Sequence, residues 1–133
     1  MSQVGTDLMH GLSLHFYTVI DWSAKGSATV FDTDRYYDIV AKSMEVEELI
    51  INHKSIMDAY DPGRKVTLLL DEWGTWYDVE PGTNPGHLYQ QNTMRDAMVA
   101  TMSLNVFHRH QDVLCLKSVC LLQRMLKESS MSP

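Results

Sequence analysis

Cysteine is scarce in this 133-residue sequence, because Cys115 and Cys120 are the only two and both lie near the carboxyl end. Two cysteines cannot form a disulfide framework, which favours a reducing compartment over a secreted, disulfide-stapled domain. A single pair at this spacing, with no second pair, is also a weak signal for a metal site. The cysteines therefore predict neither a disulfide scaffold nor a metal centre.

Basic residues are also few, with 11 Lys and Arg against 17 Asp and Glu and a formal net charge of -6. No basic stripe is visible, so we expect no nucleic-acid partner. No apolar stretch is long enough to span a bilayer, and the first ten residues show no signal pattern, so we expect no membrane association. With 44% hydrophobic residues the chain can still form a core.

Hydrophobic periodicity predicts alternating strands and helices. Residues 11–18 alternate strictly, with Leu12, Leu14 and Phe16 on one face, as in a half-buried strand. Apolar residues at helical spacing then predict a helix over residues 35–60, capped by Thr33 or Asp34 and ended by the Asp-Pro-Gly at 61–63. A buried strand over 65–71, a long Gly- and Pro-rich loop over 74–86 and a second helix over 88–108 follow, and residues 112–122 could begin another strand.

Each predicted helix has one apolar stripe that we expect to face the core. The first helix has Ile39, Val46, Leu49, Ile50, Ile56 and Met57 in its stripe, and the second has Met94, Ala97, Met98, Thr101, Met102 and Val106.

The order strand, helix, strand, helix predicts an α/β fold with a parallel sheet and crossover helices. Parallel sheets need more strands and two covered faces. The natural parent is therefore a larger α/β domain. A complete (β/α)8 barrel needs about 250 residues, of which this chain would form about a quarter to a third.

The segment 71–77, Asp-Glu-Trp-Gly-Thr-Trp-Tyr, is the most informative part of the chain. Carboxylates at the carboxyl end of a buried strand, beside aromatic rings, suggest a carbohydrate-active site, because carboxylates cleave glycosidic bonds and sugars stack on rings. The alternative is a polar loop start followed by core tryptophans. Strand alternation places Glu72 on the face of Leu68 and Leu70, and Asp71 on the other, so we expect only one of the two acids to act.

Four motifs together resemble the intracellular α-L-arabinofuranosidases of glycoside hydrolase family 51. They are Leu-Ser-Leu-His-Phe-Tyr-Thr at 12–18, Lys-Gly-Ser-Ala-Thr at 25–29, Met-Asp-Ala-Tyr-Asp-Pro at 57–62 and the segment 71–86 with its long loop. Residues 88–97 continue the match, which covers about residues 8–110.

The resemblance implies a retaining glycoside hydrolase that releases terminal α-L-arabinofuranosyl residues from arabinan or arabinoxylan oligosaccharides. Glu72 matches the family's nucleophile, at the end of the seventh strand. Tyr17 matches a tyrosine near the nucleophile on the sixth strand, and Trp76 matches an aromatic wall of the sugar pocket. His15 lies on the strand face of Tyr17, and we expect it to support the site.

Three further residues of the segment have no predicted catalytic role. Asp71 is expected to point toward the helix layer and to be structural, and no role is assigned to Trp73 or Tyr77.

The resemblance further implies that residues 1–110 form part of a catalytic TIM barrel, covering about strands six and seven with their helices and the start of strand eight. Residues 111–133 depart from the family pattern and form a divergent, frayed tail. The family's acid/base Glu, on the fourth strand, and its carboxy-terminal β-sandwich are missing from this chain. The alternatives are therefore an inactive fragment or gene remnant, or a non-catalytic sugar-binding module that uses Trp22, Trp73 and Trp76.

The remaining expectations concern ligands and location. The partner is an arabinofuranoside oligosaccharide, the full-length family is often homo-oligomeric, and the location is cytoplasmic. No cofactor is expected. No metal is expected either, because His108 and His110 have no third ligand at useful spacing.

Overall fold

Two parallel strands and three α-helices make up the computed structural model, which describes residues 5–87 and 89–113. In chain order they are β1 (Gly11–Thr18), α1 (Thr33–Lys42), α2 (Val46–Tyr60), β2 (Thr67–Thr75) and α3 (Met94–Arg109). Short 3-10 turns lie at Thr6–Leu8, Ser43–Glu45 and Pro85–His87. The predicted α/β class, with parallel strands joined through helices, is confirmed for these residues.

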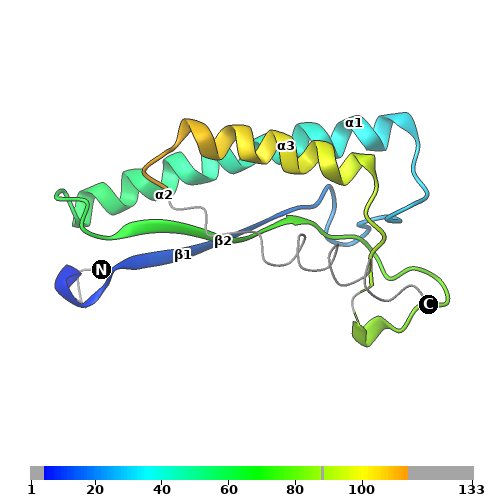
Figure 1. Cartoon of the computed structure of the whole chain (residues 1–133), viewed down its shortest axis with the longest axis horizontal. Helices are drawn as coiled ribbons and strands as arrows, with labels where there is room; N and C mark the ends of the chain where they lie inside the picture. The colour runs from blue at the N-terminus through cyan, green and yellow to red at the C-terminus, as the bar shows by residue number, and fades with distance from the viewer. Residues whose placement is uncertain (1–4, 88, 114–133) are drawn as a thin grey trace, which may run out of the picture.

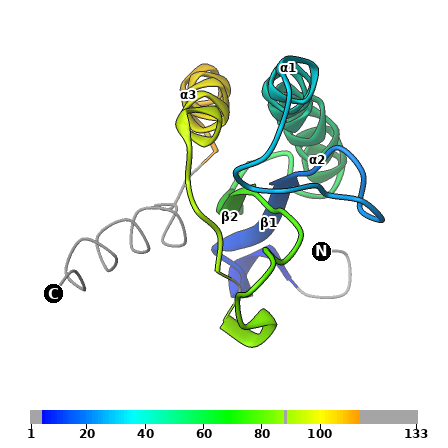
Figure 2. The same cartoon turned by 90° about the vertical axis from the view of Figure 1, so that its right-hand side faces the viewer.

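The described helices all lie on one face of the two-stranded sheet, as Figure 2 shows. The opposite face, which we call the open face, has no helix of the described residues over it. Both strands run in the same direction, so their carboxyl ends meet at one end of the sheet (Figure 1). The loops after β1 and after β2 both begin there, and loops at this edge are where parallel α/β folds place their sites.

The main core lies between the sheet and the helices. Val66, Leu68 and Leu70 of the β2 region are at most 4% exposed, and Leu14 of β1 is 9% exposed. They pack with the buried side chains Val46, Ile50, Met57, Trp73, Val106, Phe107 and Val113. The predicted apolar face of residues 11–18 is therefore confirmed at Leu14, whereas Leu12 at the sheet edge is 36% exposed.

The first predicted helix is interrupted. The 3-10 turn at Ser43–Glu45 separates α1 from α2, and the helix starts earlier than predicted because Asp32 is the N-cap. Its carboxylate accepts a hydrogen bond from the Arg35 amide at 2.8 Å, so the predicted Thr33 or Asp34 cap is wrong. The predicted end at Asp61 is confirmed, and its side chain accepts from the Val66 amide. The prediction that Ile56 faces the core is wrong, because this side chain is 62% exposed.

The second predicted helix starts later than expected, at Met94. Thr93 and Asp96 form a capping box that fixes this start, and the long loop therefore extends to residue 93. The predicted stripe of this helix is mostly wrong. Met94 is 73% exposed and Met98 is 37% exposed, while the buried positions are Arg95, Asp96, Val99, Ser103, Val106 and Phe107.

A β-bulge breaks the pairing of the two strands. Leu14 pairs with Leu70 but His15 pairs with Glu72, so Asp71 is an extra residue in β2. Beyond the bulge, pairing continues to Thr75, and β2 is longer than the predicted strand 65–71. A single extra residue reverses which face the following side chains occupy.

Two further expectations have different outcomes. The possible strand over 112–122, and with it Cys115 and Cys120, falls almost wholly outside the described residues. Among the helices that the structure describes, none combines the length and the apolar character needed to cross a bilayer.

Candidate active site

The bulge brings both acids of β2 to the open face. The imidazole of His15 lies 3.1 Å from a Glu72 carboxylate oxygen and 3.2 Å from an Asp71 oxygen. The predicted opposite orientation of Asp71 and Glu72 is therefore wrong, as is the placement of Asp71 toward the helices. The alternation that gave that prediction holds only up to Leu70, where the extra residue shifts the register. Glu72 consequently does not share the face of Leu68 and Leu70.

Glu72 has two neighbours from β1, and each contacts a different oxygen of its carboxylate. The Tyr17 hydroxyl donates a hydrogen bond to Oε1, and His15 Nδ1 lies next to Oε2. The Glu72 side chain is 40% exposed, so one side of the carboxylate remains open to a ligand. The structure thus places three of the four predicted site residues in direct contact.

Aromatic rings flank this carboxylate on the side of the loops. The Trp76 ring meets the Tyr17 ring edge-on with centroids 5.0 Å apart, and Trp22 lies 6.3 Å from Trp76. Trp22 is 60% exposed, so an apolar ring face is available beside Trp76. Trp22 is a residue that the motif comparison did not single out as part of this wall.

Trp73 has a structural role. It is 5% exposed and packs edge-on against Phe107 of α3, with centroids 5.1 Å apart. A sugar cannot reach a ring that is buried in this way. The hypothesis of a sugar-binding module that uses Trp73 is therefore wrong for this residue, and only Trp22 and Trp76 remain for that role.

The motifs at 25–29 and 77–80 are joined to one another through hydrogen bonds. The Gly26 amide donates to Asp78 at 2.9 Å, and the Asp78 amide donates to the Gly26 carbonyl at 2.9 Å. Glu80 accepts from the Ser27 hydroxyl and the Ala28 amide, both at 2.6 Å. These bonds hold the pKa of Glu80 below its ordinary value, with the Ser27 hydroxyl as the largest cause. Two loops that are about 50 residues apart in sequence thus form one support beside Trp22 and Trp76.

Arg95, a residue of α3, connects this helix to the loop after β1. Its guanidinium lies 3.7 Å from the Phe31 ring centroid and 4.2 Å from that of Tyr77, and it donates to the Ser27 and Ala28 carbonyls. Arg95 is 3% exposed, and such a cation between two rings gains from both cation–π contacts. No signal in a binary pattern of polar and apolar residues could have identified this buried arginine.

Tyr77 belongs to the same support. It is 4% exposed, and its hydroxyl donates to Asp96 at 2.8 Å. Burial, and then the neighbouring Asp96 carboxylate, raises the pKa of Tyr77 above its ordinary value. Tyr77 therefore stays a neutral hydrogen-bond donor that fixes the start of the long loop.

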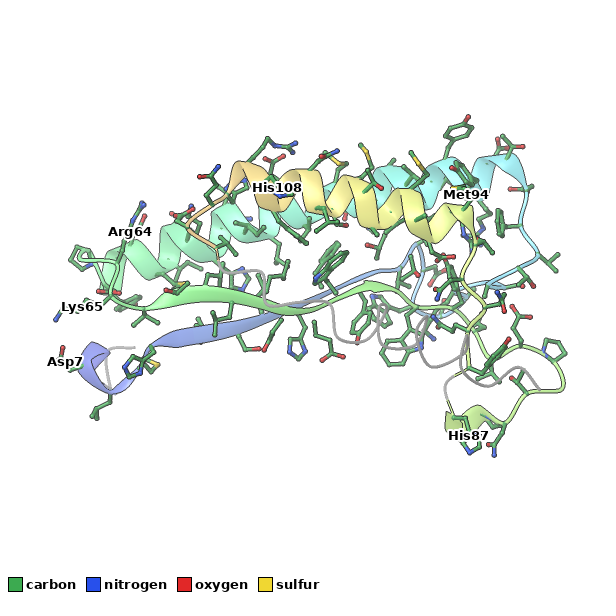
Figure 3. All side chains as sticks on the ribbon, viewed as in Figure 1. Asp7, Arg64, Lys65, His87, Met94 and His108 are labelled. Carbon is green, nitrogen blue, oxygen red and sulfur yellow. The ribbon has the colours of Figure 1, made fainter. Side chains whose placement is uncertain are left out.

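Other regions contribute less to a site. Within the part of the chain that the structure describes, no three His, Cys, Asp or Glu residues are grouped to hold a metal ion. His110, at the end of α3, instead lies 3.1 Å from Glu47. A shallow pocket lined by Lys54, Asp58 and Arg64 among others lies beside the amino end of β2. Figure 3 places Arg64 at the opposite end of the molecule from His87 in the long loop, so this pocket does not lie at the end of the sheet where that loop begins.

Three comparisons with known proteins decide the relationship. The model of the α-L-arabinofuranosidase C-terminal domain matches residues 71–124. An intracellular exo-α-L-arabinofuranosidase of Bacteroides ovatus is 54% identical over 128 residues, which is 96% of this chain. The resemblance to the family 51 arabinofuranosidases is confirmed. The crystal structure of the family 51 arabinofuranosidase from Xanthomonas axonopodis pv. citri matches with a TM-score of 0.77 and 44% identity over 82% of this chain.

The similarity to these arabinofuranosidases covers only part of each of them. The chain spans 25% of the length of the Bacteroides ovatus enzyme and 22% of the Xanthomonas chain. The described part of residues 71–124 consists of the end of β2, the long loop and α3. The α/β arrangement of this chain therefore corresponds to one part of a larger arabinofuranosidase.

Proposed function

We propose that this chain contributes the nucleophile side of the active site of a retaining α-L-arabinofuranosidase, with Glu72 as the nucleophile. The observation that carries the proposal is the position of Glu72. It lies in the carboxyl-terminal half of β2, on the open face, in contact with His15 and with Tyr17, whose ring meets the ring of Trp76. Glycosidase activity in general is supported by the arabinofuranosidases that the chain resembles.

In this mechanism Glu72 reacts with the sugar, and the side chains around it hold the reacting groups in place. Glu72 attacks the anomeric carbon, the glycosidic C–O bond breaks, and a covalent glycosyl ester forms that water later hydrolyses. Tyr17 and His15 hold the carboxylate oxygens in position for the attack. Trp76, with Trp22 beside it, offers a ring face to the sugar. A second carboxyl group protonates the leaving oxygen, and the family resemblance assigns it to another strand of the enzyme.

The same proposal extends to the fold. Residues 1–110 supply about strands six and seven of a (β/α)8 barrel, with the open face lining its interior and the described helices outside. Residues 111–133 form a divergent tail. The full enzyme acts in the cytoplasm, as the name of the intracellular Bacteroides ovatus relative suggests, and forms homo-oligomers that bind arabinofuranoside oligosaccharides.

A second candidate is that the chain by itself is an inactive fragment. The observation that favours it is the length, a quarter of the related enzyme, together with the exposure of His15, whose side chain is 50% exposed on the open face. An isolated chain of this kind is expected to release no arabinose. Measurable turnover by the purified 133-residue chain would exclude this second candidate.

The test of the first candidate uses a hybrid enzyme, in which residues 5–110 of this chain replace the aligned segment of the Bacteroides ovatus relative. We expect the hybrid to hydrolyse 4-nitrophenyl α-L-arabinofuranoside, with the unaltered relative as the reference. With methanol present, proton NMR of the first product should show a methyl arabinofuranoside of retained configuration. A folded hybrid that forms the inverted product, or no product, would contradict the proposal.

The bonds of Glu80 give a pH-dependent prediction for the hybrid. Because the pKa of Glu80 is held below its ordinary 4.5, its contribution to folding is present above about pH 4.5 and is lost as the pH falls through the folded-state pKa. Replacing Glu80→Gln should therefore lower the denaturation midpoint at pH 7, and the gap to the parent hybrid should close in acid. A gap that stayed constant from pH 7 to pH 3 would contradict this account. Glu48→Gln, an exposed position on α2, is the matched control.

A further inference from the structure

Asp71 is the residue that the bulge turns to the open face. Its Oδ1 accepts a hydrogen bond from the Ser13 hydroxyl at 2.8 Å and lies 3.2 Å from His15 Nε2. Both partners belong to β1, so the contacts cross from the extra residue of one strand to its neighbour. Bulges beside active sites commonly re-aim a side chain in this manner. Asp71 therefore has a defined position on the same face as Glu72, although it takes no part in the attack on the sugar.

His15 lies between the two acids and faces each with a different ring nitrogen. Nε2 is next to Asp71, and Nδ1 is next to Glu72 at 3.1 Å. An imidazole that carries a proton on both nitrogens forms an ion pair with each carboxylate, whereas a neutral ring can donate to only one of them. The order of contacts is thus Ser13, Asp71, His15, Glu72, and then Tyr17 on the far Glu72 oxygen.

We propose that Asp71 is a positioning residue that acts on Glu72 through His15. The Asp71 carboxylate fixes the plane of the imidazole, so that Nδ1 stays directed at Glu72 Oε2 while Tyr17 holds Oε1. Both oxygens of the nucleophile are then fixed before the sugar arrives, which is the kind of support that a reacting group needs from its neighbours. This inference rests on the proposed function of Glu72, and it deepens that proposal by adding a residue that does not touch the sugar.

The competing explanation is that Asp71 only stabilises the bulge. Both explanations predict that a change at Asp71 lowers activity, so activity alone does not separate them. They differ in what happens when Glu72 is absent. A positioning residue has nothing left to position, whereas a misfolded bulge continues to harm the whole site.

The experiment measures Asp71→Asn in the hybrid enzyme in two backgrounds. In the first, Glu72 is intact and hydrolysis of 2,4-dinitrophenyl α-L-arabinofuranoside is followed. In the second, Glu72→Ala is supplied with azide, which attacks the anomeric carbon, forms the C–N bond and displaces the dinitrophenolate, giving an arabinofuranosyl azide of inverted configuration. The exogenous nucleophile is not held by His15, so the two backgrounds report the role of Asp71 through a double-mutant comparison.

We expect Asp71→Asn to lower kcat/KM by about 10- to 100-fold when Glu72 is present. This is the loss that follows when a residue that orients a metal ligand is replaced, and Asp71 orients His15 in the same way. In the azide reaction of Glu72→Ala, the same change should alter the rate less than about twofold. Ser13→Ala, which removes only the hydroxyl that anchors Asp71, should give a smaller loss with the same dependence on Glu72. It also provides the test if Asp71→Asn fails to fold.

Asp58→Asn is the matched control, because Asp58 is also a carboxylate with a basic partner but belongs to α2 and contacts Arg64, which Figure 3 shows at one end of the molecule. It should change neither reaction. Equal losses from Asp71→Asn in both backgrounds would overturn the positioning role and assign Asp71 to the bulge alone. No loss in either background would also overturn it. If Glu72→Ala itself left hydrolysis unchanged, the proposed function would fail first, so the two failures are distinguishable.

Discussion

Replacing Glu72→Ala in the hybrid enzyme is expected to reduce turnover of an aryl arabinofuranoside by several orders of magnitude, on the order of 10⁴-fold or more. The substitution removes the atom that forms the bond to the anomeric carbon, so the covalent step has no nucleophile. Binding of the sugar should change much less, because Trp22 and Trp76 remain in place. The loss should therefore appear in kcat/KM and in kcat, with little change in the affinity for a non-hydrolysed arabinoside.

Two further variants separate the loss of the nucleophile from a loss of structure. Glu72→Gln keeps the size of the side chain and an oxygen that accepts from Tyr17, and it should be nearly as inactive as Glu72→Ala. Glu48→Ala, on the exposed side of α2, should behave as the parent hybrid. Azide should restore product formation to Glu72→Ala but not to an unfolded protein. Near-normal hydrolysis by Glu72→Ala would exclude Glu72 as the nucleophile.

The residue pattern alone placed Glu72 beside a buried strand and aromatic rings, and only the resemblance to known enzymes singled it out as the nucleophile. The strand alternation used beside that resemblance placed it on the face of Leu68 and Leu70, and the structure places it on the opposite face. Burial in the structure shows the bulge as a change of phase, which the sequence does not reveal because Leu69 and Trp76 are apolar as well. Buried positions fall on even numbers at Val66, Leu68 and Leu70, and on odd numbers at Trp73 and Tyr77. Such a change of phase indicates one inserted residue between the two sets.

The helix α3 shows a second limit of binary patterning. The methionines Met94 and Met98 suggested an apolar face, but the buried face contains Arg95, Asp96 and Ser103. These polar groups can be buried because they find partners in the loops, such as the Ser27 carbonyl for Arg95. Those partners lie far away in the sequence, so a local pattern cannot reveal them. The predicted α/β class with parallel strands needed only local periodicity, and it was confirmed for the described residues, although the first helix is split into α1 and α2.

The second large effect is expected at Asp96, the buried carboxylate under the site. Its Oδ1 accepts from the Thr75 hydroxyl at 2.7 Å and from the Tyr77 hydroxyl at 2.8 Å. Its Oδ2 accepts from the Thr93 amide at 2.7 Å and from the Thr93 hydroxyl at 3.0 Å, which closes the capping box of α3. One side chain that is 4% exposed thus joins the end of β2, the start of the long loop and the first turn of α3.

Replacing Asp96→Ala takes the carboxylate acceptor away from the buried hydroxyl groups of Thr75 and Tyr77 and removes the Asp96 half of the capping box. Each unsatisfied buried donor costs about 1–3 kcal/mol, so the free energy of unfolding should fall by about 3 kcal/mol or more. Urea denaturation of the hybrid enzyme measures this loss. The pKa of Tyr77 should also fall toward its ordinary value, because the neighbouring carboxylate is one of the causes that raise it. An absorbance titration of the tyrosines detects that shift.

Asp96→Asn provides the informative comparison with Asp96→Ala, because an amide can keep its oxygen toward Thr75 and Tyr77 but then presents an NH₂ group to the Thr93 amide. It should therefore lose the bond from the Thr93 amide, which is its half of the capping box, and retain the contacts to Thr75 and Tyr77. Asp38→Ala, an exposed carboxylate on α1, should leave stability nearly unchanged. If Asp96→Ala were no less stable than Asp38→Ala, Asp96 would not be the joint between strand, loop and helix. If Asp96→Asn were much more stable than Asp96→Ala, the contacts to Thr75 and Tyr77 would account for most of the effect of Asp96.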